Sequence, residues 1–212
     1  LMYTRDESEY FTAKRKAARQ VVGSDRVRDL PSNAEVREQV QILADLVEGD
    51  RRHRELQSMR IEALRFLRLL SRWRPRLIGS VLTGHIRAGS DIDIHAFADS
   101  PALVADMLEQ AGYDCQIEHK RVLKDRQQRV FTHIHIQAEY RVEITVYDAD
   151  KAAFPFRSSI TGKSIERADA AQLERVLRGA HPEIDIELEL ERTIEEIDPY
   201  DLFASLLRAL DG

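Results

Sequence analysis

Two short stretches decide the fold of this chain: Leu77-Ile78-Gly79-Ser80 and Gly89-Ser90-Asp91-Ile92-Asp93-Ile94. The second stretch alternates polar and apolar residues as far as residue 97, which is the period of a half-buried β-strand. Because residues i and i+2 of a strand point to the same face, Asp91 and Asp93 are expected side by side, with Ile92 and Ile94 in the core. Two carboxylates this close repel each other, so the pattern predicts a bound divalent cation.

A third acidic residue lies in a strand pattern of the same kind. Residues 141–147 alternate polar and apolar side chains, and Glu143 falls on the polar face. If this strand lies beside the first, three carboxylates converge, a set that can hold two metal ions for a phosphoryl displacement. We therefore expect Mg²⁺ or Mn²⁺ at Asp91, Asp93 and Glu143, although Glu139 and Asp148 compete with Glu143 for the third position.

Phosphate groups suit the stretch around Gly79 and Ser80. Glycine allows the backbone to approach a phosphate closely, and the serine hydroxyl adds a hydrogen-bond donor. Two cations outside this pair, Arg87 in the spacer and Lys163 further along the chain, could reach a triphosphate. Each of the two is equally well explained as an ordinary surface cation.

This pattern resembles the signature of the DNA polymerase beta-like nucleotidyltransferases. It consists of an apolar residue, a Gly-Ser pair, a spacer of about ten residues and Asp-x-Asp between apolar residues. The resemblance covers residues 76–147. It implies an α+β fold with a mixed sheet flanked by helices. Carried over by position, it implies that Gly79, Ser80 and Ser90 contact the nucleotide and that Asp91 and Asp93 bind metal. Glu143 would be the third carboxylate, which in the family helps to activate the attacking hydroxyl.

The resemblance implies transfer of a nucleoside monophosphate from an NTP, by default ATP, to a hydroxyl or phosphate acceptor, with release of pyrophosphate. The acceptor is unidentified and could be a small molecule, RNA or a protein. In size the chain is similar to the small stand-alone bacterial members of the superfamily. The alternative is a catalytically silent binding module that keeps the fold, for example an antitoxin-like partner protein.

Charge is unevenly distributed over the 212 residues, whose formal net charge is −5. Residues 1–78 contain 17 Lys/Arg against 12 Asp/Glu, whereas residues 166–212 contain 5 against 13. We expect an N-terminal helical extension over 1–75, a catalytic core over 76–165 and an acidic helical segment over 166–212. The basic third could face nucleic acid, or could be Arg-rich surface helices. A single cysteine and the lack of a long apolar run favour a cytoplasmic protein without a membrane partner.

Periodicity predicts further elements. Helices are expected at 6–20, 34–48, 51–72, 101–111, 167–178 and 200–210, and strands at 76–78, 91–97, 115–122, 130–137 and 141–147. Ser32 or Asn33 is expected to cap the second helix and Gly49 to end it. Residues 183–191 fit both periods, and helix is preferred. The alternating residues His133, His135 and Gln137 could form a metal or substrate face, but a water-exposed polar strand face is preferred. His95 is expected at the rim of the cleft or lining it.

Overall fold

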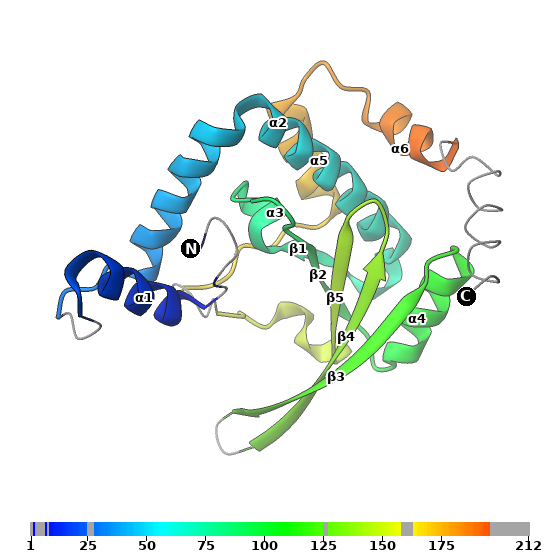
Figure 1. The fold of residues 1–212 in the computed structure, drawn as a ribbon. Coiled ribbons are helices and arrows are strands. Elements are labelled where there is room, and N and C mark those ends of the chain that lie inside the picture. Colours follow the sequence, from blue (N-terminus) through cyan, green and yellow to red (C-terminus); the bar gives the residue numbers. More distant parts are fainter. Residues whose placement is uncertain are drawn as a thin grey trace, which may run out of the picture.

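The computed structural model describes residues 2, 7, 9–24, 28–124, 127–157 and 163–195, which form an α+β fold (Figure 1). Two long helices come first, then strands alternating with short helices, then two closing helices. The elements are α1 Tyr10–Val22, α2 Asn33–Leu69, η1 Ser71–Trp73, β1 Arg76–Ile78, α3 Gly79–Thr83, β2 Ile92–Phe97, α4 Pro101–Gln110, β3 Cys115–Lys124, β4 Gln127–Gln137, β5 Arg141–Tyr147, η2 Ala149–Ala153, α5 Ala170–Ala180 and α6 Ile186–Glu195.

The described strands form one five-stranded mixed sheet in the order β1-β2-β5-β4-β3. β2 and β5 are parallel, and the three other pairs are antiparallel. The expected strands are confirmed to within a few residues. The outer hairpin is longer than predicted because β3 and β4 continue to pair with each other, up to Lys124 opposite Gln127, beyond the point where β5 ends.

One face of the sheet packs against the second half of α2 and against α4. The expected alternation is confirmed, since Ile92 and Ile94 are almost fully buried there beside Val142 and Ile144 of β5. Core residues are drawn from 59–73, 77–146 and 173–190, so helices from both ends of the chain share one hydrophobic core with the sheet. The opposite face carries the acidic side chains.

Helix α2 consists of two helical segments that meet at a kink at Gly49, as the sequence predicted. It begins with a capping box in which the Ser32 Oγ accepts from the Glu35 N–H at 3.1 Å and the Glu35 carboxylate accepts from the Ser32 N–H at 2.7 Å. Gly49 has non-helical torsions, φ 49° and ψ −130°, so the predicted interruption is confirmed as a bend. Among the described residues, no helix is long and apolar enough to cross a membrane.

The arginines of α2 were expected on its surface, and for two of those in the second half this prediction is wrong. Arg60 is 8% exposed and donates from Nε to the Val81 carbonyl at 3.1 Å and from Nη2 to the Leu82 carbonyl at 3.0 Å. Arg52, also buried, donates to the Gly84 and Ile86 carbonyls at 2.7 and 2.9 Å. These guanidinium groups satisfy backbone carbonyls within α3 (Val81, Leu82) and just after it (Gly84, Ile86), which is why burying them is tolerated.

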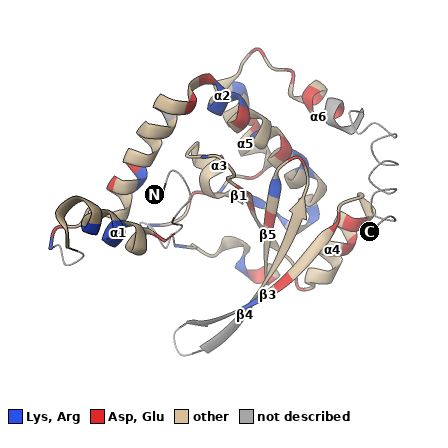
Figure 2. Cartoon of the chain, viewed as in Figure 1, with Lys and Arg blue, Asp and Glu red and all other residues tan. Residues whose placement is uncertain are grey.

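Two further arginines of α2 connect it to the acidic C-terminal helices. Arg68 reaches Glu174 of α5 at 2.8 Å and Glu187 of α6 at 2.7 Å, and Arg65 donates to the Glu189 carbonyl at 2.7 Å. Figure 2 shows basic residues in the part of α2 that lies beside α5. The charge asymmetry along the sequence is therefore partly balanced inside the molecule, and these cations are engaged by protein groups.

The two C-terminal helices differ from expectation mainly in their bounds. α5 begins three residues later than predicted, at a capping box formed by Asp169 and Gln172. The ambiguous residues 183–191 become helical from Ile186 onward. Ile186 and Leu190 are buried one helical turn apart, so packing on the core selects the helical period over the strand period. The helix predicted at 200–210 lies outside the described residues.

Removing Arg60 tests the role of its buried hydrogen bonds. Arg60→Met leaves the Val81 and Leu82 carbonyls without their donor, so we expect the free energy of unfolding in urea to fall by about 3–5 kcal/mol. Arg60→Lys keeps the charge and should lose less. The matched control is Arg54→Met, an exposed position on the same helix, with an expected change within about 0.5 kcal/mol. Equal losses at positions 54 and 60 would contradict this role.

Candidate active site

The polar face of the sheet is organised in rows that run across the strands. Strand register places Asp93, Glu143, His135 and Gln116 in one row, from β2 across β5 and β4 to β3. The next row contains His95, Thr145, His133 and Glu118. Beyond it lies an aromatic row in which Phe97, Tyr147 and Phe131 make ring contacts. Acidic, imidazole and aromatic groups thus follow one another along the same face.

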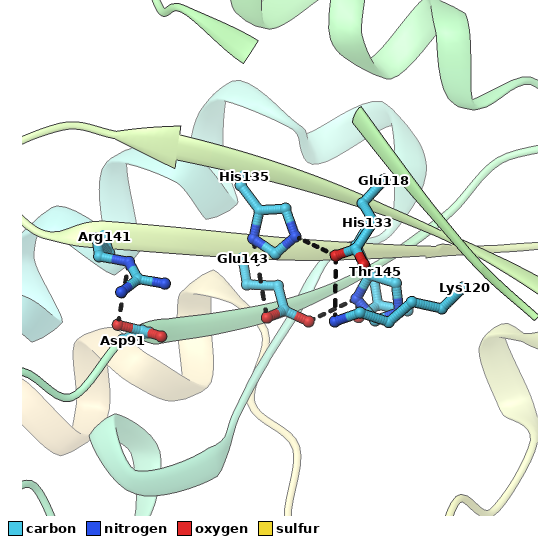
Figure 3. A network of polar contacts seen from close by, with 8 residues as sticks. All are labelled: Asp91, Glu118, Lys120, His133, His135, Arg141, Glu143 and Thr145. Atoms are coloured by element: carbon cyan, nitrogen blue, oxygen red, sulfur yellow. Dashed lines mark hydrogen bonds and ion pairs between the residues drawn. The ribbon is translucent and has the colours of Figure 1, made fainter. Parts of the chain in front are cut away.

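The register distinguishes among the candidates for the third carboxylate. Glu143 is the direct neighbour of Asp93 in the parallel β2–β5 pair. Glu139 lies in the turn between β4 and β5, and Asp148 follows the end of β5. Asp91 precedes β2, and its Oδ1 atom is buried without a hydrogen-bond partner, with the Arg141 Nε 3.6 Å away (Figure 3). Asp93 and Glu143 therefore occupy neighbouring positions on adjacent strands, and Asp91 lies just before the first of them.

The pKa of Asp93 is raised by its surroundings in this arrangement. Burial is the main cause, followed by the charges of Glu143 and Asp91, and together they raise the pKa of Asp93 to about 7. At neutral pH this carboxyl is therefore close to half protonated. A positive charge beside it would favour the ionised form, which is what a divalent cation supplies.

Gly79 is in direct contact with this carboxylate. Ile78 is the antiparallel partner of Asp93, and the chain turns into α3 at Gly79 with φ +73°. A Cβ atom at position 79 would overlap the Asp93 Oδ2 atom, far inside van der Waals contact. Glycine is thus required here both by the backbone torsion and by the close approach of Asp93.

A cavity of about 560 Å³ opens beside Asp93. It is lined by seven of the eight residues predicted as site residues, namely Gly79, Ser80, Arg87, Ser90, Asp91, Asp93 and Lys163. The eighth, Glu143, lines an adjoining cavity of about 480 Å³ together with Arg141, His135 and Gln137. Asp91 lines both cavities, so the carboxylates lie where the two hollows meet.

In the first cavity, Arg87 and Ser90 make hydrogen bonds to each other, and Arg87 also reaches the N-terminal segment. The Ser90 Oγ accepts from the Arg87 N–H, and the Ser90 N–H donates to the Arg87 carbonyl, both at 2.9 Å, which closes the turn before Asp91. The Arg87 guanidinium donates to the Met2 carbonyl at 2.7 Å. Lys163, which follows the last strand in the sequence, also lines this cavity.

Arg37 is a cavity residue that sequence reasoning missed. It comes from the first half of α2, and its Nη2 lies 3.2 Å from the Thr83 Oγ1 and 2.8 Å from the His85 Nδ1. Burial, and then the charge of Arg37, lower the pKa of His85. No local pattern predicts this contact, because it joins residues more than forty positions apart; only the basic character of the N-terminal third pointed in this direction.

The histidines of the polar face also differ from expectation. His133 and His135 were expected to face water, but the His133 Nδ1 lies 2.5 Å from the Glu143 Oε1 and its side chain is 14% exposed (Figure 3). His95 does not lie at a rim: it is 5% exposed, between the rings of Tyr147 and Phe156. Burial, followed by the charge of Arg167, lowers the pKa of His95 to about 4, so it is neutral.

The residues present fit a divalent cation in their chemistry. Hard carboxylate oxygens lie on adjacent strands, and the Asp91 Oδ1 is buried and without a hydrogen bond. In the described part of the chain, however, no three His, Cys, Asp or Glu side chains are gathered as a ready-made ligand cluster. Glu143 is hydrogen bonded to His133 instead.

No protein-family model matches this chain, and no curated protein matches it significantly. What the site can do is therefore inferred from its own residues and their geometry.

Gly79→Ala tests the contact with Asp93. The matched control is Gly112→Ala, because Gly112 also has a positive φ, +89°, but open space at its Cβ position. Both variants acquire backbone strain, and only Gly79→Ala adds an overlap with the carboxylate. We expect its free energy of unfolding to fall by about 1–3 kcal/mol more than that of the control. Equal losses of unfolding free energy in the two variants would show that the Asp93 side chain moves aside without cost.

The raised pKa of Asp93 makes stability depend on pH. Between about pH 4 and pH 7 the folded protein keeps a proton on Asp93 that the unfolded chain has released, so stability falls as pH rises. The slope from this group is at most about 1.4 kcal/mol per pH unit. Asp93→Asn removes it, so the variant's stability relative to wild type should grow over this window and then level off. Urea unfolding in EDTA measures this, with the exposed Asp106→Asn as control; parallel wild-type and Asp93→Asn profiles would contradict it.

Proposed function

We propose that the protein is a metal-dependent nucleotidyltransferase, which moves a nucleoside monophosphate from an NTP to a hydroxyl or phosphate acceptor and releases pyrophosphate. The observation that carries the proposal is the first cavity. It is lined by Gly79, Ser80, Asp91, Asp93 and Lys163. The resemblance implies that Gly79 and Ser80 contact the nucleotide. Glu143 adjoins it through Asp91.

Each cavity residue has a role in this proposal. Gly79 gives the phosphates close access to the backbone, Ser80 offers a hydroxyl donor, and Arg87 and Lys163 place positive charge on the wall. Asp91, Asp93 and Glu143 would hold Mg²⁺ or Mn²⁺, which when bound stabilises the charge that develops on the phosphoryl oxygens. The rest of the catalytic effect is orientation of the donor phosphate and the acceptor oxygen.

The second cavity is suited to the acceptor. It shares Asp91 with the first cavity and contains Glu143, while Arg141, Gln116 and Gln137 offer hydrogen bonds around it. In the transfer, the acceptor oxygen forms a bond to the α-phosphorus as the bond to pyrophosphate breaks. We assign the acceptor's proton to Glu143, a carboxylate that lines this cavity.

One observation favours the alternative, a binding module. Ile42, Leu43, Leu46 and Val47 of α2 are exposed at positions i, i+1, i+4 and i+5, so one helix face presents apolar side chains to solvent. Leu46 is 83% exposed. A partner protein that covers this face would not require Asp91 or Asp93, and this difference separates the two candidate functions.

Thermal unfolding with each of the four NTPs, in Mg²⁺ or Mn²⁺ and in EDTA, tests the enzyme proposal. A ligand at a hundred times its Kd adds about 2.7 kcal/mol, which for this size shifts Tm by roughly 5–10 °C. We expect such a shift with at least one NTP, dependent on metal and absent in Asp91→Asn/Asp93→Asn. Asp106→Asn should shift as wild type does. A folded protein that responds to no NTP would overturn the proposal and favour the binding module.

A further inference from the structure

The carboxylate of Glu143 is held between two imidazole rings. The His133 Nδ1 lies 2.5 Å from Oε1, and the His135 Nδ1 lies 3.9 Å from Oε2 (Figure 3). Both histidines come from β4, on the side of β5 opposite to Asp93. In Figure 3, Oε1 faces His133, while Oε2 lies on the side of Asp91 and Arg141. One oxygen of Glu143 is thus hydrogen bonded to His133, and the other lies on the side of Asp91, a residue that lines both cavities.

The contact with His133 is shielded and directional. The side chains of His133 and Glu143 are 14% and 27% exposed, so water competes weakly for the hydrogen bond. A carboxylate accepts only, so the Nδ1–H of His133 donates to it, which fixes the imidazole tautomer. Thr145, itself buried, places its hydroxyl 3.3 Å from the same nitrogen. Both contacts are made by this one nitrogen, so the Nδ1 edge of the ring is engaged by protein groups.

We infer that His133 is a positioning residue for the candidate metal site: it holds Oε1 of Glu143 so that Oε2 stays on the side of Asp91, next to the strand that carries Asp93. Glu143 stands next to Asp93 in the sheet, and like charges there repel. Without a donor behind it, the Glu143 side chain would rotate away from Asp93 and be lost as a third oxygen ligand. The inference rests on the proposed function in giving Glu143 a role towards a divalent cation.

His135 plays a lesser part. Its Nε2 lies 3.2 Å from the Glu118 Oε2, and Lys120 lies 3.4 Å from that same oxygen. Both partners are about half exposed, so water screens this chain of contacts. The contact between His135 and Glu143 is also too long for a hydrogen bond. The two histidines should therefore differ in their effect on Glu143.

Binding of Mn²⁺ alone, followed by electron paramagnetic resonance, tests the inference without any nucleotide or acceptor. Groups that orient metal-ligating residues typically contribute 10- to 100-fold in affinity, so His133→Ala should weaken Mn²⁺ binding by roughly that factor. His133→Asn should restore most of it, because the amide nitrogen of asparagine can take the place of Nδ1. His135→Ala should have a smaller effect than His133→Ala. The matched control is His119→Asn on β3, whose imidazole contacts Thr132 and not Glu143.

The outcomes separate the inference from the proposed function. If Asp91→Asn/Asp93→Asn abolishes Mn²⁺ binding while His133→Ala binds as wild type does, the positioning role is overturned and the metal site stands. If none of these variants changes Mn²⁺ binding, the proposed function itself fails. Should His133→Ala not fold, His133→Leu against His133→Asn decides, since both fill the space and only Asn can donate; equal affinity of these two would also overturn the role.

Discussion

The parallel pairing of β2 with β5 places Asp93 beside Glu143, and two carboxylates at neighbouring positions repel each other. Asp93 is half-buried, and its pKa is raised to about 7 by desolvation first and then by the charges of Glu143 and Asp91. Several surrounding residues reduce this repulsion. Arg141 stands near Asp91, His133 donates to Glu143, and Gly79 leaves room for the Asp93 carboxylate. Acidic groups that repel one another are destabilising, so their concentration at a cavity indicates a use for negative charge.

Helix α2 holds the segment around α3 in place through its arginines. Arg60 binds carbonyls within α3 and Arg52 binds carbonyls just after it, which fixes the segment that begins at Gly79. The first half of α2 brings Arg37 to the wall of the same cavity. One helix therefore contributes to the core at one end and to the candidate site at the other, with the bend at Gly49 between them.

The local part of this design could be predicted from the sequence. Alternation identified β2 and β5 and the faces of Asp93 and Glu143, and the Gly79-Ser80 pair was placed beside them because its spacing resembles a known signature. Neither the partner of Glu143 nor the origin of Arg37 could be found this way. Such contacts depend on strand order and helix placement, which a single sequence does not encode in any local period. Buried arginines were missed for the same reason, because the hydrophobic pattern treats every arginine as a surface residue.

The order of strands also has a consequence for how the protein folds. Ile92 pairs with Val142, and the segment between them contains α4 and the whole β3–β4 hairpin. The hairpin joins residues close in sequence and can form early, whereas the β2–β5 pair closes a long loop and must wait for the core that stabilises it. The mutually repelling carboxylates are therefore brought together late in folding. On this topology we expect Asp93 and Glu143 to come together only when the hydrophobic core is forming, so that burial of the core can offset their repulsion.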